Sequence, residues 1–249
     1  MLSSLTPWIY GGTGAAAGLG LVWGGCAYAA LWPGSRIFGE ALIAPRLPGE
    51  LALTFDDGPN PVWTPRLLDI LAGHGVRGTF FLIGNYAHAQ PALVRRIAEA
   101  GHAIGNHSWS HPNLALTAGT KVADELKRTS GTIEQILGRP VHLFRPPFGA
   151  RRPKVFHIAR SLGLAPVLWN AMTNDWEEPS ADRIAENLAH KIDAMTRRGH
   201  ATNIVLHDGS HRAQGTNREP SVNAAWQLLA KFKAKYRFVT LDEWSRRAI

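Results

Sequence analysis

Short apolar runs rich in β-branched and aromatic residues alternate with helical hydrophobic periodicity from residue 49 onwards. The apolar runs predict seven strands, at residues 51–55, 79–83, 103–106, 142–145, 165–169, 203–206 and 237–240. Periodic segments between them predict six helices, at residues 64–73, 91–100, 120–137, 153–162, 181–197 and 221–236. Strands that alternate with helices form parallel βα units, so we expect an α/β fold, either closed as a barrel or doubly wound.

The first 35 residues have a different pattern, because no Lys, Arg, Asp or Glu precedes Arg36. Residues 8–32 are almost wholly apolar, and as a helix they would span about 37 Å, enough to cross a bilayer core of about 30 Å. Trp8 and Trp32 suit the two interfaces of such a span. We therefore predict a membrane anchor in residues 1–35, a linker in 36–48 and a catalytic domain in 49–249.

Other interpretations of this segment stay open. Ala27-Tyr28-Ala29 resembles the small-x-small cleavage site of a signal peptide, although a basic n-region is missing. Seven glycines between residues 8 and 32 disfavour a soluble buried helix. Arg36 and Arg46 follow the segment, so the positive-inside rule would keep the domain in the cytoplasm, whereas a cell-wall role needs the other side. The side of the membrane is left open.

The composition limits the class of protein. An apolar fraction of 45% with nine Trp in 249 residues excludes a mainly disordered chain. The single cysteine, Cys26, excludes an internal disulfide framework and any multi-cysteine metal cluster. The net charge of +8 favours anionic surroundings such as acidic polymers, phospholipid headgroups or nucleic acid. Because the basic residues form only scattered pairs and no nucleic-acid-reading motif is present, we expect no nucleic-acid partner.

Polar and ionisable residues follow most of the predicted strands. In βα folds the carboxyl ends of the strands form the site, so these residues are expected to meet. The five segments concerned are Asp56-Asp57-Gly58-Pro59, His107-Ser108-Trp109-Ser110-His111, Arg145-Pro146-Pro147-Phe148-Gly149, Asp175-Trp176 and His207-Asp208-Gly209.

Two histidines at a spacing of four, His107 and His111, would face the same side of a helical turn and bind one metal ion. With Asp57 they would make a site of two histidines and one carboxylate, which suits zinc or another divalent ion and also non-haem Fe(II) oxygenases. His207 and His211 form a rival pair. His207 ends an apolar strand, which suits a single acid or base, and His211 lies in a Gly/Ser/Arg loop where we expect it to be solvated.

The remaining charged groups suggest separate roles. Asp56 and Asp57 are adjacent in a strand and should point in opposite directions, so each should have its own function. Arg145 suits an ion pair with a carboxylate such as Asp56. Arg151 and Arg152 are expected to be solvated at the rim.

Together the five segments, in this order, resemble the motif set of NodB-type polysaccharide deacetylases, carbohydrate esterase family 4, over roughly residues 49–243. The resemblance implies a distorted (β/α)7-type barrel, the NodB homology domain. It also implies a divalent metal, most often zinc with cobalt as an alternative, and the removal of N- or O-acetyl groups from carbohydrates. It implies that Asp56 is the catalytic base, that Arg145 orients this base, and that His207 is the general acid. The implied metal ligands are Asp57, His107 and His111. Phe148 would bind the oxyanion through its backbone N–H, and Trp176 and Asp175 would lie on the substrate side.

One position departs from the family pattern. Many members have an Asp four residues before the tryptophan, where it pairs with the catalytic histidine, and this chain has Met172 there. Without a carboxylate partner the pKa of His207 is expected to fall, unless Asp175 or Asp208 replaces the missing group.

The resemblance leads us to expect a metal-dependent hydrolase of N-acetylated amino sugars. Its substrate would be a chitooligosaccharide, peptidoglycan, poly-N-acetylglucosamine or a lipid-linked amino sugar. The alternative is a carbohydrate-binding pseudoenzyme of the same fold, which Met172 alone favours. The oligomeric state is left open.

Overall fold

The computed structural model describes residue 30 and residues 32–247. The predicted anchor in residues 1–35 therefore lies mostly outside the described residues. Among the helices that are described, none is both long and apolar enough to cross a bilayer.

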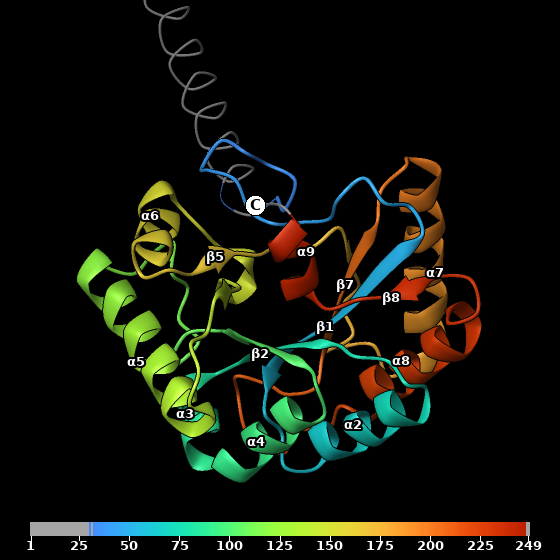
Figure 1. Cartoon of the computed structure of the whole chain (residues 1–249), viewed down its shortest axis with the longest axis horizontal. Coiled ribbons are helices and arrows are strands. Elements are labelled where there is room, and N and C mark those ends of the chain that lie inside the picture. Colours follow the sequence, from blue (N-terminus) through green and yellow to red (C-terminus); the bar gives the residue numbers. More distant parts are fainter. Residues whose placement is uncertain (1–29, 31, 248–249) are drawn as a thin grey trace, which may run out of the picture.

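A single curved sheet of parallel strands forms the centre of the described chain (Figure 1). Its order is β5-β4-β3-β2-β1-β7-β6, and β8 pairs with one end of β1. The strands are β1 (Glu50–Gly58), β2 (Thr79–Leu82), β3 (Ala103–Asn106), β4 (Leu143–Phe144), β5 (Ala165–Pro166), β6 (Ala171–Met172), β7 (Thr202–His207) and β8 (Arg237–Phe238). The predicted α/β class with parallel strands is confirmed.

Helices cover the outside of this sheet, as Figure 1 shows for α5, α4, α2, α8 and α7. They are α2 (Trp63–Gly73), α3 (Gly84–Ala89), α4 (Pro91–Glu99), α5 (Gly119–Leu137), α6 (Pro153–Ser161), α7 (Ala181–Arg197), α8 (Glu219–Phe232) and α9 (Leu241–Arg247), with a 3-10 turn η1 (Pro147–Gly149). Side chains of β1 alternate between two cores. Leu53 and Phe55 join the large core under the outer helices, and Ala52 joins a second core with Trp244 of α9.

The barrel is incomplete rather than closed. The predicted strand at 165–169 is replaced by two short strands, because residues 165–166 pair with β4 whereas residues 171–172 pair with β7 at the other edge of the sheet. Residues 167–170 connect these two strands and cross the gap between the two edges of the sheet. Part of the predicted linker fills the same gap: Leu42 bridges Val167, Ile43 O accepts from Asn203 Nδ2 at 2.9 Å, and Pro45 O accepts from Ala201 N at 2.9 Å. Residues 42–45 thus pack as part of the domain.

Arg151 attaches the preceding segment to the domain, and our expectation that it is solvated is wrong. Its side chain is fully buried. The guanidinium donates to the carbonyl oxygens of Ala30 at 3.2 Å, Trp32 at 2.6 Å and Ser35 at 3.2 Å. Carbonyl oxygens of Ala30, Trp32 and Ser35 thus replace water around the buried guanidinium of Arg151, an arrangement that the local sequence does not reveal.

Two further differences concern helices. The sequence pattern missed α3 and α9, which have six and seven residues and are too short for a clear periodicity. The helix predicted at residues 64–73 begins one residue earlier, at Trp63, and Thr64 does not cap it. Asn60 Oδ1 accepts from the backbone N–H groups of Val62 and Trp63 instead, and Thr64 Oγ1 accepts from Asn60 N.

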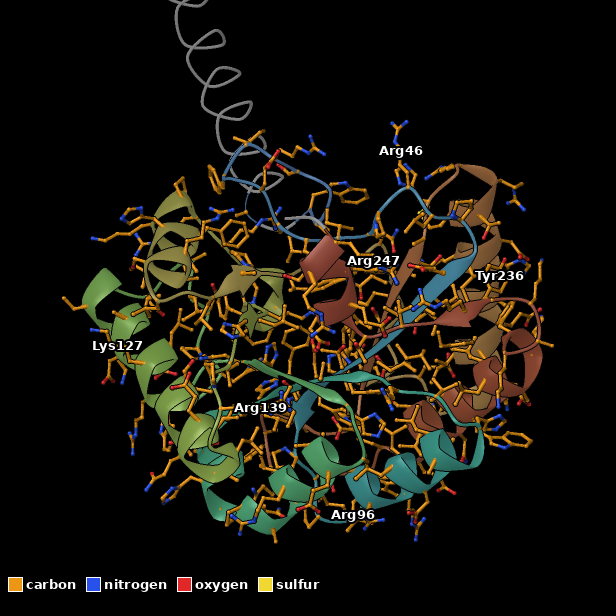
Figure 2. The ribbon with its side chains drawn as sticks, in the orientation of Figure 1. Arg46, Arg96, Lys127, Arg139, Tyr236 and Arg247 are labelled. Atoms are coloured by element: carbon orange, nitrogen blue, oxygen red, sulfur yellow. The ribbon has the colours of Figure 1, made fainter. Side chains whose placement is uncertain are left out.

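Basic side chains are dispersed over the surface. Figure 2 labels Arg46, Arg96, Lys127 and Arg139 at widely separated places on the described chain. Arg96 also pairs with Asp69 at 2.6 Å. The labelled cations therefore do not form one basic face.

Candidate active site

Asp56 and Asp57 both reach the same cavity at the carboxyl end of β1, so the expectation that they point in opposite directions is wrong. Asp57 has φ +68°, and the pairing of β1 with β2 shifts register between Asp56 and Gly58. This break in the strand removes the usual alternation of side chains. Asp56 Oδ2 lies 3.9 Å from His107 Nε2, and Asp57 Oδ1 lies 3.4 Å from the same nitrogen.

The His107–His111 segment is an irregular loop rather than the helical turn that we predicted. Ser108 and His111 have φ values of +64° and +59°. Side chains hold the loop in this form: Ser108 N donates to Asn106 Oδ1 at 2.8 Å, and His111 N donates to Ser108 Oγ at 3.1 Å. The two imidazoles still meet, with ring centroids 5.0 Å apart.

Backbone strain is concentrated at this site. Within the described residues, the non-glycine residues with positive φ are Asp57, Ser108, His111 and Phe148, and each belongs to a segment that the sequence had singled out. A left-handed conformation costs an L-residue about 1–3 kcal/mol, which the surrounding contacts must offset. Local strain of this kind is typical of sites where side chains must be aimed.

The residues Asp57, His107 and His111 are buried, and their ligand atoms lie within 4.8 Å of one another. His107 Nδ1 lies 2.8 Å from the carbonyl oxygen of Arg145. Because a carbonyl only accepts, Nδ1 carries the hydrogen and Nε2 presents a lone pair towards Asp57 Oδ1. Two acceptors that face each other in a buried place require a cation or proton between them.

The charge states suit a metal ion. Burial raises the pKa of Asp57, but the facing imidazoles of His107, His111 and His211 outweigh it and hold that pKa well below its usual value. Burial lowers the pKa of His111, even with Asp57 beside it, which favours the neutral ligating form. Asp57 Oδ1 has no hydrogen-bond donor of good geometry among the described residues. Two imidazoles and a carboxylate thus fit a divalent cation.

Arg145 holds Asp56 from behind, as the sequence predicted. Its Nη1 donates to Asp56 Oδ1 at 2.7 Å and to Thr54 Oγ1 at 2.7 Å. The guanidinium is fully buried and lies 4.1 Å from the centre of the Phe81 ring. Oδ1 of Asp56 is therefore occupied, and Oδ2 remains on the side of His107.

His207 has a carboxylate partner despite Met172, because Asp175, one of the two replacements that the sequence offered, takes the place of the missing group. Asp175 Oδ1 lies 2.9 Å from His207 Nδ1, and Asp175 Oδ2 accepts from His207 N at 2.8 Å and Ser221 Oγ at 2.6 Å. Burial lowers the pKa of His207, but Asp175 outweighs it and raises that pKa to about 9. Asp175 is buried behind His207 and supports it, so its predicted position on the substrate side is wrong.

Asp208 has a different environment and is not the partner of His207. It is buried, its carboxylate accepts from Thr64 Oγ1, and burial raises its pKa to about 7. The next residue must be glycine, because a Cβ on Gly209 would lie 1.9 Å from the carbonyl oxygen of Asp57. The His207-Asp208-Gly209 segment therefore packs directly against the end of β1.

One cavity of about 410 Å³ is lined by Asp56, Asp57, His107, His111 and His207. Phe148 and Trp176 form part of its wall and are 52% and 37% exposed, which leaves aromatic faces open to a ligand. The sequence analysis considered His211 only as part of a rival metal pair and expected it to be solvated. His211 is exposed, as expected, but its ring also stacks on His111 with centroids 4.5 Å apart and lines the cavity, which the loop composition did not reveal.

The chain is similar in sequence and in fold to known polysaccharide deacetylases. The sequence profile described as "Polysaccharide deacetylase" matches residues 45–167. A chitooligosaccharide deacetylase from Azorhizobium caulinodans is 39% identical over 174 residues, which cover 70% of this chain and 80% of that protein.

Solved structures share the fold. The crystal structure of the Bc1960 peptidoglycan N-acetylglucosamine deacetylase has a TM-score of 0.73 and 34% identity, over 82% of this chain and 91% of that chain. BA3943 from Bacillus anthracis, described as a CE4 family pseudoenzyme, has a TM-score of 0.72 and 26% identity, over 82% of this chain and 68% of that chain. The strand arrangement, the matched profile and the close relative agree, and the chain belongs to the polysaccharide deacetylase family, hydrolases of carbon–nitrogen bonds in linear amides.

Proposed function

We propose that this protein is a metal-dependent deacetylase that hydrolyses N-acetyl groups of amino sugars in a glycan of the chitooligosaccharide or peptidoglycan type. The observation that carries the proposal is the buried cluster of Asp57, His107 and His111, with Asp56 beside it and His207 in the same cavity. The names of the relatives, a chitooligosaccharide deacetylase and a peptidoglycan N-acetylglucosamine deacetylase, support this substrate class.

Asp57, His107 and His111 would hold the metal. Two imidazoles and one carboxylate form a typical catalytic zinc donor set, and cobalt is an alternative. Such an ion supplies Lewis acidity, which activates water and polarises the amide carbonyl. The Arg145 carbonyl fixes the tautomer of His107, so that the nitrogen facing Asp57 is the ligand.

Asp56 acts as the general base. Its Oδ1 is held by Arg145, which leaves Oδ2 to accept the proton of the attacking water. The buried ion pair also fixes the carboxylate in one orientation, since Thr54 shares the same guanidinium nitrogen.

His207 acts as the general acid. Asp175 occupies Nδ1 and raises the pKa, so the ring is an imidazolium at neutral pH and Nε2 donates its proton to the departing amine nitrogen. Protonation is needed because an amine anion is a poor leaving group. The backbone N–H of Phe148 is our candidate for the donor that stabilises the oxyanion, and its left-handed conformation aims this short segment.

Trp176 would contribute to glycan binding. Its ring packs edge-on against His207, with centroids 5.1 Å apart, and more than a third of its surface is open. Aromatic faces of this kind pack against the apolar faces of sugar rings. A membrane-attached location through residues 1–35 remains part of the proposal on sequence grounds, and it would also suit a lipid-linked amino sugar.

The alternative function is a carbohydrate-binding pseudoenzyme, which the similarity to BA3943 keeps in view. The presence of Asp56, the metal ligands and an Asp175–His207 pair argues against it, because a protein that only binds does not need a tuned acid and base.

Mass spectrometry of N-acetylated oligosaccharides after incubation with the full chain tests the proposal. We expect the loss of one acetyl unit with zinc or cobalt present, no loss after chelation, and recovery when metal is restored. Glycan binding without acetate release at any metal concentration would support the pseudoenzyme instead.

A further inference from the structure

The two histidines of the cluster are held in different ways. His107 has a hydrogen bond from Nδ1 to the carbonyl oxygen of Arg145. His111 Nδ1 is buried and has no hydrogen-bond partner among the described residues. Metal-binding histidines are usually oriented by a hydrogen bond at their second nitrogen, so the orientation of His111 must come from another contact.

Aromatic rings supply that contact. The His211 ring stacks on His111 with centroids 4.5 Å apart and an interplanar angle of 10°. The Phe148 ring meets His111 edge-on, with centroids 4.6 Å apart and an angle of 74°. These two rings contact the imidazole from a face and an edge, which restricts its rotation about the side-chain bonds.

His211 also contacts the carboxylate ligand. Its backbone N–H donates to Asp57 Oδ2 at 3.3 Å, and its Nδ1 lies 3.6 Å from the same oxygen. One residue therefore contacts both His111 and Asp57.

The loop that carries His211 is itself fixed at both sides. Arg218 Nε donates to the carbonyl oxygen of Gly209 at 2.6 Å, and Tyr86 OH donates to that of Ser210 at 3.0 Å. Asn60 Nδ2 donates to the carbonyl oxygen of Thr216 at 3.0 Å. The fold thus holds the backbone on both sides of His211, and the side chain, 36% exposed, lies against His111.

We propose that His211 is a positioning residue of the metal site, which holds His111 by ring stacking and Asp57 through its backbone N–H. The inference rests on the proposed function, since it concerns the same cation site. In this role the flat ring of His211 is decisive, and the contact of its Nδ1 with Asp57 Oδ2 at 3.6 Å is secondary. If His211 were instead a fourth metal ligand, a ring nitrogen would be essential. His211 is not, however, within the compact group of ligand atoms of Asp57, His107 and His111.

Three substitutions separate these roles. His211→Phe keeps an aromatic ring without nitrogens, His211→Leu keeps apolar bulk without a ring, and His211→Ala removes the side chain. The backbone N–H to Asp57 remains in all three. His190→Ala is the matched control, because His190 is an exposed histidine on α7.

The measurement is the affinity of the metal-free full chain for zinc and cobalt, by isothermal titration and by the visible spectrum of bound cobalt. We expect His211→Ala and His211→Leu to bind about 10-fold more weakly or worse, the range typical of lost supporting contacts, and His211→Phe and His190→Ala to bind like wild type. Far-UV circular dichroism identifies any variant that fails to fold, and the remaining side-chain variant then makes the comparison.

Equal affinity in all variants would overturn the inference, and so would a His211→Phe protein as weak as His211→Ala, which would indicate a ligand nitrogen. Failure of the wild-type chain to bind either metal would instead refute the proposed function itself.

Discussion

Nδ1 of His207 lies 2.9 Å from Oδ1 of Asp175, thirty-two positions earlier in the chain, while the second carboxylate oxygen accepts the backbone N–H of the same histidine. Asp175 is therefore bound to His207 at two points, and Ser221 Oγ holds it from a third. This carboxylate compensates for the apolar Met172, and it keeps the pKa of His207 at about 9 against the effect of burial.

Replacing this carboxylate should change the pH dependence of catalysis. Asp175→Asn keeps an oxygen acceptor for His207 but removes the negative charge, so the pKa of His207 should fall. A general acid loses activity above its pKa, so the alkaline limb of the kcat profile should move to lower pH by about one unit or more. The measurement is kcat against pH with saturating metal. Asp182→Asn, at an exposed carboxylate on α7, is the control and should leave the limb in place.

The adjacent carboxylates should respond differently to the same conservative change. Asp57→Asn removes a metal ligand, so metal affinity and deacetylation should both be lost. Asp56→Asn removes only the base, so activity should drop by about 10²–10⁴-fold while metal affinity stays within a few-fold of wild type. Isothermal titration and acetate release, measured on the same samples, separate the two effects. If both variants lose metal to the same extent, Asp56 is a ligand and the assignment of a base is wrong.

The sequence was sufficient to predict which segments meet, because strand ends in parallel βα units converge on one edge. Asp56, His107, Arg145 and His207 all lie at or just after the carboxyl ends of strands that the hydrophobic pattern predicted. The pairing of Arg145 with Asp56 followed from charge alone.

Details that depend on tertiary contacts could not be predicted. The left-handed conformation of Asp57 is what turns both carboxylates into one cavity, and nothing in an Asp-Asp-Gly-Pro pattern reveals it. His211 is followed by polar loop residues, and its contact with His111 comes from a loop fixed by Arg218 and Tyr86. Arg151 looks like a surface charge in sequence, because three of its four acceptors, in Ala30, Trp32 and Ser35, lie more than a hundred positions away.

Residues 30–35 should contribute to stability through Arg151. A chain that begins at residue 36 leaves the buried guanidinium without the carbonyl oxygens of Ala30, Trp32 and Ser35. We expect its free energy of unfolding to fall by about 2–4 kcal/mol relative to a chain that begins at residue 29, because unpaired buried charge is costly. Urea unfolding of the two chains measures the difference. Equal stability would mean that water replaces these carbonyl groups.

His102 should make stability depend on pH far from the catalytic groups. The residue is 4% exposed, Nδ1 accepts from Gly78 N at 3.0 Å, and burial lowers its pKa to about 4. The unfolded chain, with a pKa near 6.5, binds this proton more readily, so stability is complete above about pH 6.5 and is lost as the pH falls towards 4. His102→Gln retains an oxygen acceptor that does not titrate. Between pH 7.5 and pH 5 the unfolding free energy of wild type should therefore drop by about 2 kcal/mol more than that of the variant. Urea denaturation of both proteins at both pH values gives the four free energies of unfolding that the comparison needs. All other titrating groups are common to the two proteins. An equal drop in both would mean that His102 is protonated in the folded state at pH 5, and the Gly78 hydrogen bond would then have to break.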